Sequence, residues 1–283
     1  MSAMPEEPRV HAIPIRGGRI EAFTLRGGSG VPLLVLGGIE TGLRPLAGTE
    51  SLLQRRWSGR AQRRTVVVVG RPLPAEAADA GRMMHPRIIA DAVAGTIEEL
   101  GWPVAIEAES GGARIALWLA VDHPQLVARL VLASVSSETP ADSPMAGQMA
   151  TWIEMAERGE WGAFFSRMAV QMKPANSVSA EAFAVAARLQ PRPATPERFI
   201  GELRATLDPS SWMSERLGEI GVPTLVLAGG QDQVVPVASS RLVGERIPDA
   251  RFEVDPDCGH TVRSSFTGYD ELVEAFLAEG DAS

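Results

Sequence analysis

Short apolar runs alternate along the chain with segments whose apolar positions recur at helical spacing. Five of these runs are predicted to be strands, at residues 32–36, 65–69, 104–108, 129–133 and 223–228, and a sixth is expected at 251–254. The first five lack polar alternation, which is typical of parallel strands covered on both faces. Edge strands are expected to come first in the chain, near residues 20–25.

The helical segments fall between the predicted strands. Apolar residues at positions 88, 89, 92, 93, 97 and 100 have helical spacing, and Gly101 follows them as a stop signal. Further helices are predicted near residues 112–121, 237–247 and 269–277. Because parallel strands need crossover connections, this order predicts an α/β fold with a doubly wound, mostly parallel sheet.

One long stretch interrupts the alternation. Residues 136–214 contain no convincing strand but have helical patterns near 145–157, 161–172, 180–189 and 197–207, separated by proline-rich joints. We therefore expect a core formed by residues 1–135 and 215–283, with residues 136–214 inserted as a helical cap, or lid. The large apolar side chains of this cap either form its own core or line a substrate pocket, for which the candidates are Trp152, Trp161, Phe164, Met168 and Trp212.

Composition narrows the class of protein. The chain has 283 residues, is 45% hydrophobic and 22% charged, and carries a formal net charge of −8 without any basic block, so nucleic acid is not an expected partner. Residues 1–18 do not resemble a secretion signal, and no apolar run is long enough to cross a membrane. A cytoplasmic protein acting on a small molecule is expected, and a homodimer is left open.

The segment around Ser110 carries the clearest chemical signal. An apolar strand runs into Ser110 and leads directly into a helix, so the serine must occupy a tight strand-to-helix turn at the carboxyl edge of the sheet. Ala108 and Gly112 leave room for a strained backbone, and Gly111 can present its N–H to a developing oxyanion. Taken alone, the serine could equally be a helix cap.

Two later loops supply the partners that a nucleophilic serine needs. Asp232 follows the strand at 223–228, and His260 follows the strand at 251–254. A serine hydroxyl is a poor nucleophile until a base removes its proton, and a histidine oriented by a carboxylate suits that task. The order Ser110, Asp232, His260 is the one expected for a nucleophile-elbow architecture.

These motifs resemble those of the α/β-hydrolase-fold serine hydrolases, and the resemblance covers nearly the whole chain. It implies a catalytic triad of Ser110, Asp232 and His260, and an oxyanion hole formed by the backbone N–H groups of Ile39 and Gly111. Ala108 departs from the usual first glycine of the elbow.

Two glutamates near the triad leave alternatives open. Glu109 is expected either to be solvated or to form a salt bridge behind the sheet, or else to approach His260 and raise its pKa. Glu138 is a spare candidate for the triad acid.

No other chemistry is indicated. No histidine pair has metal-ligand spacing, and the single cysteine, Cys258, is expected to pack rather than react. The glycines of residues 27–30 precede a strand and predict a hairpin turn rather than a phosphate loop. We therefore expect no metal and no cofactor.

The resemblance implies a hydrolase that cleaves an ester, lactone or related acyl bond through an acyl-enzyme. The Trp, Met and Phe content of the cap favours a small, largely apolar substrate over a sugar or a highly charged acid. Basic residues near the predicted loops are scarce, which argues against phosphorylated acyl groups, although Arg44, Arg71 and Arg114 could fold inward. A C–C bond hydrolase, a thioesterase, a cofactor-free perhydrolase and a non-catalytic ligand-binding protein remain alternatives.

Overall fold

A single sheet organises the computed structural model, which describes residues 8–42, 44–100, 103–173, 185, 187–188, 193 and 195–281. Its eight strands are β1 (Arg9–Ile15), β2 (Gly18–Leu36), β3 (Arg64–Val69), β4 (Leu73–Pro74), β5 (Val104–Glu109), β6 (Val127–Ala133), β7 (Thr224–Gly229) and β8 (Ala250–Asp255). The strand order is β1-β2-β5-β6-β7-β8, with β3 and β4 paired to β2. The run from β5 to β8 is parallel throughout, which confirms the predicted doubly wound arrangement.

The first part of the sheet differs from the expected hairpin. The first half of β2 pairs with β3 in descending register, from Ala22 with Val69 to Leu25 with Val66, whereas the second half pairs in ascending register from Leu33 with Val66. The chain therefore reverses its direction around the beginning of β3. Gly27 lies at this reversal, where a Cβ atom would come within 1.9 Å of a backbone oxygen. The predicted hairpin turn is thus a wider reversal of β2, and both halves of β2 pair with β3. The edge strand β1 was not predicted from the apolar pattern.

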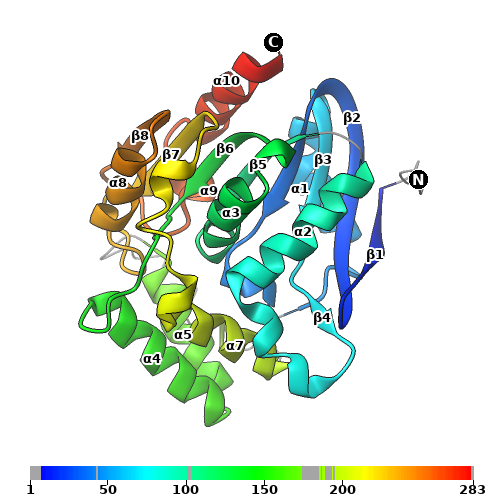
Figure 1. Ribbon diagram of the computed structural model, residues 1–283. Coiled ribbons are helices and arrows are strands. Elements are labelled where there is room, and N and C mark those ends of the chain that lie inside the picture. The colour runs from blue at the N-terminus through cyan, green and yellow to red at the C-terminus, as the bar shows by residue number, and fades with distance from the viewer. Residues whose placement is uncertain are drawn as a thin grey trace.

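Helices cover both faces of the sheet (Figure 1). On one face, α2 (Pro86–Leu100), α3 (Gly111–Asp122) and α8 (Val237–Arg246) contribute to the larger apolar core. On the other, α1 (Glu50–Ala61) and α10 (Tyr269–Asp281) supply Trp57, Val273 and Phe276 to a second core. Burial of apolar side chains on both faces explains why the strands have no polar alternation.

A third layer lies at the carboxyl ends of the strands (Figure 1). It contains α4 (Pro144–Glu157), α5 (Trp161–Gln171) and α7 (Pro196–Leu207), close to three of the helices expected in the insertion. Their apolar faces form a core in which Phe164 lies edge-on to Trp152, Trp161 and Phe199. The helix expected at 180–189 lies outside the described residues, apart from positions 185, 187 and 188.

Short helices occupy several connections. They are η1 (Ile39–Gly42), η2 (Ala77–Asp79), η3 (Arg82–Met84), η4 (Pro124–Leu126), η5 (Pro209–Ser211), η6 (Leu217–Glu219) and α9 (Val262–Ser265). Two of them, η1 and α9, directly follow loops at the carboxyl edge of the sheet. They position backbone and side chains at the site described below.

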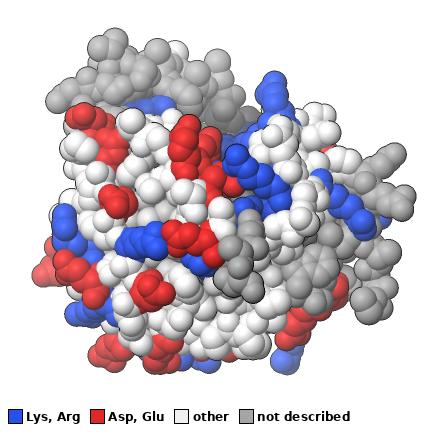
Figure 2. All heavy atoms as spheres, turned by 90° about the horizontal axis from the view of Figure 1, so that it is seen from above, with Lys and Arg blue, Asp and Glu red and all other residues white. Residues whose placement is uncertain are grey.

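Acidic and basic side chains are interspersed on the face opposite these cap helices (Figure 2). This is consistent with the absence of a basic block in the sequence. None of the described helices is both long enough and apolar enough to cross a bilayer.

Candidate active site

Ser110 lies on the sharp turn between β5 and α3. Its φ angle is 54°, a left-handed conformation that costs a non-glycine residue on the order of 1–3 kcal/mol and is typical of functional sites. The backbone N–H of Ser110 donates to the carbonyl of Ala133 at the end of the adjacent strand, 2.9 Å away. Gly112 faces the end of β2, where an added Cβ would lie 2.3 Å from the Leu36 oxygen. Small residues at the elbow therefore allow the turn to approach the neighbouring loop.

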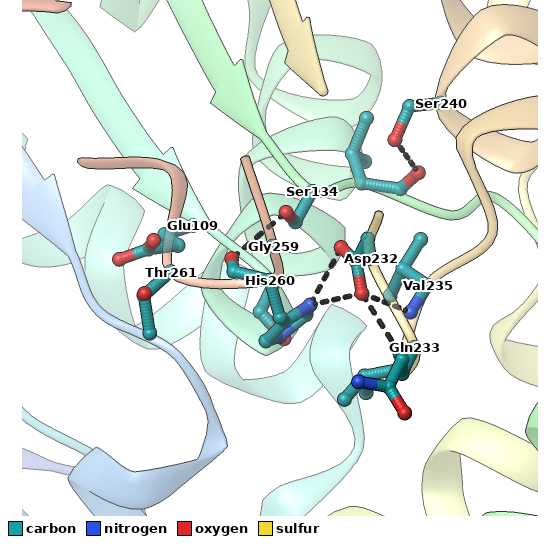
Figure 3. A network of polar contacts seen from close by, with 12 residues as sticks. Glu109, Ser134, Asp232, Gln233, Val235, Ser240, Gly259, His260 and Thr261 are labelled. Carbon is teal, nitrogen blue, oxygen red and sulfur yellow. Dashed lines mark hydrogen bonds and ion pairs between the residues drawn. The ribbon is translucent and has the colours of Figure 1, made fainter. Parts of the chain in front are cut away.

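Asp232 and His260 reach the same edge from the loops after β7 and β8 and face one another (Figure 3). His260 Nδ1 lies 2.8 Å from Asp232 Oδ2, and His260 Nε2 lies 3.0 Å from Ser110 Oγ. The Asp232 carboxylate is fixed in turn, because Oδ1 accepts hydrogen bonds from the backbone N–H groups of Val234 and Val235. The structure therefore brings the three residues expected to form a triad into one hydrogen-bonded chain.

The electrostatic surroundings raise the pKa of His260. Burial is the largest single influence and opposes the charged imidazolium, but the nearby carboxylates, Asp232 first among them, together outweigh it, so the pKa of His260 is raised above its ordinary value. Glu109 and Glu40 add to the increase. Glu109 also lies 3.6 Å from the guanidinium of Arg263, so both expected roles of this glutamate are present together.

Two backbone N–H groups border the serine. Ile39 is the first residue of η1 and Gly111 is the first residue of α3, so neither N–H has a partner within its own helix. They lie side by side, since a Cβ added to Gly111 would be 3.3 Å from the Ile39 nitrogen. The pair of donors expected at Ile39 and Gly111 is therefore adjacent to Ser110.

Glu138 and Cys258 take other positions. The Glu138 carboxylate accepts a hydrogen bond from Ser214 rather than from His260. Cys258 is buried, and this burial raises the pKa of its thiol to about 11, so the thiol stays protonated at neutral pH.

A cavity of about 30 Å³ lies beside Ser110 and His260. Apolar side chains cover most of its described wall, and they are Ile39, Met145, Met149, Trp152, Met172, Val234 and Val235. Trp152 is the expected pocket residue that lines it. Trp161, Phe164 and Met168 belong to or pack against the cap core instead, and Trp212 is half-buried away from the cavity. A larger, open cleft between α1 and α10 contains none of the triad residues.

Several polar residues at the site carry no local signal in the sequence. Arg71 is buried and pairs with Glu202 of α7, with Nη2 and Oε1 2.7 Å apart. The same nitrogen donates to the carbonyls of Gly37 and Gly38, immediately before Ile39. Ser134 holds the histidine loop from the other side by donating to the His260 carbonyl. These contacts join residues more than 30 positions apart, so spacing alone could not reveal them.

No group of three His, Cys, Asp or Glu side chains within the described residues is arranged to bind a metal ion. The polar groups at the cavity are instead a hydroxyl, an imidazole and backbone N–H groups. This set suits proton transfer and oxyanion binding.

Comparison with known proteins places this geometry in a family. Residues 87–264, more than half of the chain, match the family described as serine aminopeptidase, S33. The chain belongs to this family of α/β hydrolases. The match spans the elbow, the acid loop and the histidine of the hydrolase.

Individual relatives agree with this assignment. The 2-hydroxymuconate semialdehyde hydrolase of Pseudomonas putida is 28% identical over 209 residues, which are 71% of this chain and 72% of that protein. MGS-M2, an alpha/beta hydrolase enzyme from a Medee basin deep-sea metagenome library, has a TM-score of 0.76 and 16% identity, covering 96% of this chain and 98% of that one. The enol-lactonase from Burkholderia xenovorans LB400 has a TM-score of 0.73 and 16% identity, covering 95% and 100%. These two structures share the fold of the hydrolase.

Proposed function

We propose that this hydrolase cleaves an ester, lactone or related acyl bond of a small, largely apolar substrate through an acyl-enzyme. The observation that carries the proposal is the chain of contacts from Ser110 Oγ to His260 Nε2 at 3.0 Å and from His260 Nδ1 to Asp232 at 2.8 Å. Both distances are within the range needed for proton transfer and for orienting the imidazole.

In the proposed reaction, Ser110 Oγ attacks the substrate carbonyl while His260 accepts its proton. The carbonyl oxygen becomes an oxyanion that accepts hydrogen bonds from the N–H groups of Ile39 and Gly111. Collapse of this intermediate breaks the acyl–oxygen bond, and His260 donates its proton to the leaving alcohol. Water, deprotonated by His260, then attacks the acyl-enzyme and releases the acid, so no cofactor is consumed.

The proposal extends to the setting of the reaction. Residues 136–214 form the cap that sets substrate choice, as an insertion between core segments 1–135 and 215–283. The acidic net charge of −8 favours a diffusible small molecule over nucleic acid or an anionic membrane surface, with the cytoplasm as the site of action.

A fluorophosphonate probe and simple aryl esters test this assignment. We expect the probe to label Ser110 at neutral pH, and we expect Ser110→Ala and His260→Ala to lower kcat by roughly 10⁴ or more. Peptide mapping by mass spectrometry identifies the labelled residue. Labelling of His260→Ala at the parent rate would contradict the assignment of the base.

Hydrolysis of a C–C bond is a second candidate. It is favoured by the similarity to 2-hydroxymuconate semialdehyde hydrolase, which extends over 72% of that protein. The two reactions are distinguished by comparing kcat/KM for 2-hydroxymuconate semialdehyde with kcat/KM for phenyl pentanoate. A kcat/KM at least 100-fold higher for the semialdehyde would favour C–C cleavage as the principal activity.

A further inference from the structure

The described wall of the cavity beside Ser110 includes one arginine and no lysine. Arg114 lines the same wall as Ser110, Gly111 and His260. It lies four residues after Ser110 on α3, and therefore one helical turn from the nucleophile on the same face of the helix. The Cα–Cβ bonds of a helix tilt toward its N-terminus, so the side chain of Arg114 leaves the helix on the side of the turn that carries Ser110.

Arg114 has no acidic partner in the described part of the chain. The residue is only 6% exposed, and its Nη atoms contact neutral oxygens of Ser136, Thr139 and Ser211. Its Nε is buried and has no hydrogen-bond partner among the described residues. Burial lowers the pKa of Arg114 to about 10, so the side chain still carries its charge at neutral pH.

Two other buried arginines near the site are neutralised by carboxylates. Arg71 pairs with Glu202, and Arg263 pairs with Glu107 at 2.8 Å. A buried guanidinium without an opposite charge is costly, because desolvation is not offset by an ion pair. The charge on Arg114 is therefore available to a group that enters the cavity.

We propose that Arg114 binds a carboxylate on the substrate and so makes the hydrolase selective for acyl compounds with a free carboxylate about one helical turn from the scissile carbonyl. A turn of helix rises roughly 5 to 6 Å, which a chain of about three to five bonds can span. The methionine and tryptophan side chains of the wall cover the apolar spacer. This inference rests on the proposed acyl hydrolysis and specifies its substrate class.

A structural role for Arg114 makes a different prediction. Its contacts with Ser136, Thr139 and Ser211 join the two segments that enter and leave the cap helices. If Arg114 only joined these segments, its removal would affect charged and neutral substrates equally. The decisive quantity is therefore the ratio of kcat/KM for a charged substrate to kcat/KM for a neutral one, rather than the activity on either substrate alone.

The experiment compares monophenyl glutarate, which carries a free carboxylate, with the neutral methyl phenyl glutarate by measuring phenol release. We expect the wild-type enzyme to favour the acid in kcat/KM, and we expect Arg114→Met to reduce that preference at least about 30-fold, the low end for removing one partner of a buried charge pair. Arg114→Lys should retain part of the preference. Ser211→Ala, which removes one hydrogen-bond partner of Arg114 but keeps the guanidinium, should preserve the preference within about threefold.

Inhibition provides a test that needs no variant. Glutarate should compete with an aryl ester at least tenfold more tightly than pentanoate, its singly charged counterpart of equal length. Equal inhibition by the two acids, or the same preference for the acid in wild type and Arg114→Met, would overturn the role of Arg114.

The failure of the proposed function has a separate signature. If no ester is turned over, the proposed acyl hydrolysis is wrong. The role of Arg114 is still tested by thermal-shift binding of glutarate and pentanoate to the wild type and to Arg114→Met: the wild type should prefer glutarate, and the variant should not. Equal binding of the two acids in that assay would overturn the inference.

Discussion

The buried ion pair between Arg71 and Glu202 provides a sharp test of how the cap supports the site. Both side chains are almost inaccessible, with 0% and 6% exposure, so solvent does not screen their attraction. Replacement of Glu202 by glutamine leaves the buried Arg71 guanidinium without its ion-pair partner. Breaking a buried pair in this way costs about 3–5 kcal/mol. At about 2–4 °C per kcal/mol for a chain of comparable size, Tm should fall by about 6 to 20 °C.

A double-mutant cycle isolates the interaction from the effects of each side chain. The variants are Glu202→Gln, Arg71→Met and the double variant, measured by urea unfolding and by calorimetry. Because the double variant buries neither charge, it should be at least about 2 kcal/mol more stable than the sum of the single losses predicts. Strict additivity of the two losses would refute the reasoning, since it would mean that the two charges do not stabilise one another.

The same pair has a kinetic consequence. Arg71 Nη2 donates to the carbonyls of Gly37 and Gly38, which precede the Ile39 N–H in the chain. Loss of Glu202 frees Arg71 to move, and Ile39 moves with the loop. Since an oxyanion donor acts on the transition state, kcat should fall, by up to about 100-fold, while KM changes little. A loss confined to KM would place Arg71 in substrate binding instead.

Three further predictions concern other residues of the site. Glu109→Gln removes a negative charge that raises the pKa of His260. Because His260 must be neutral to act as the base, the acidic limb of the pH profile of kcat/KM should move to lower pH. An unchanged acidic limb would exclude this coupling between Glu109 and His260. Cys258, 1% exposed and with a thiol pKa of about 11, should react with iodoacetamide at pH 8 only after unfolding, as followed by mass spectrometry. Gly112→Ala would push a Cβ to within 2.3 Å of a carbonyl at the end of β2 and should cost about 1–3 kcal/mol in urea unfolding, whereas Gly95→Ala, with open space around it, should be neutral or stabilising.

The sequence predicted those features whose signals are local. A strand followed by Ser110 and a helix can form only a tight turn, and the small residues around it indicate the same geometry. Asp232 and His260 each follow a buried strand, so the carboxyl edge of a parallel sheet brings them near the serine. The strands from β5 to β8 and most helices were identified for the same reason, since apolar runs and helical spacing are properties of short segments.

Features that depend on distant residues were not predictable. The reversal of β2 around β3 and the edge strand β1 follow from pairing along the sheet, which no local pattern specifies. Trp161 and Phe164 were candidates either for the pocket or for the core of the cap, and size alone could not separate the two; they lie in the cap core, because cap helices must bury their own apolar faces. The ion pair of Arg71 joins residues 131 positions apart, and its partner could not be chosen from the many acidic residues of the chain.

The cap contributes charge as well as apolar cover to the site. Glu202 on α7 neutralises Arg71, which in turn holds the loop of Ile39, so a residue of a cap helix helps to fix a backbone donor of the core. Arg114, in contrast, extends from the core toward both ends of the cap and has no carboxylate partner among the described residues. The charge of Arg71 is thus neutralised within the protein, whereas the proposed role of Arg114 leaves its charge to be neutralised by a ligand. Because an unpaired buried charge is costly, a substrate carboxylate should bind more tightly when the cap helices enclose it than when water reaches the guanidinium. Cap packing and selectivity for an anionic substrate therefore depend on the same enclosed volume.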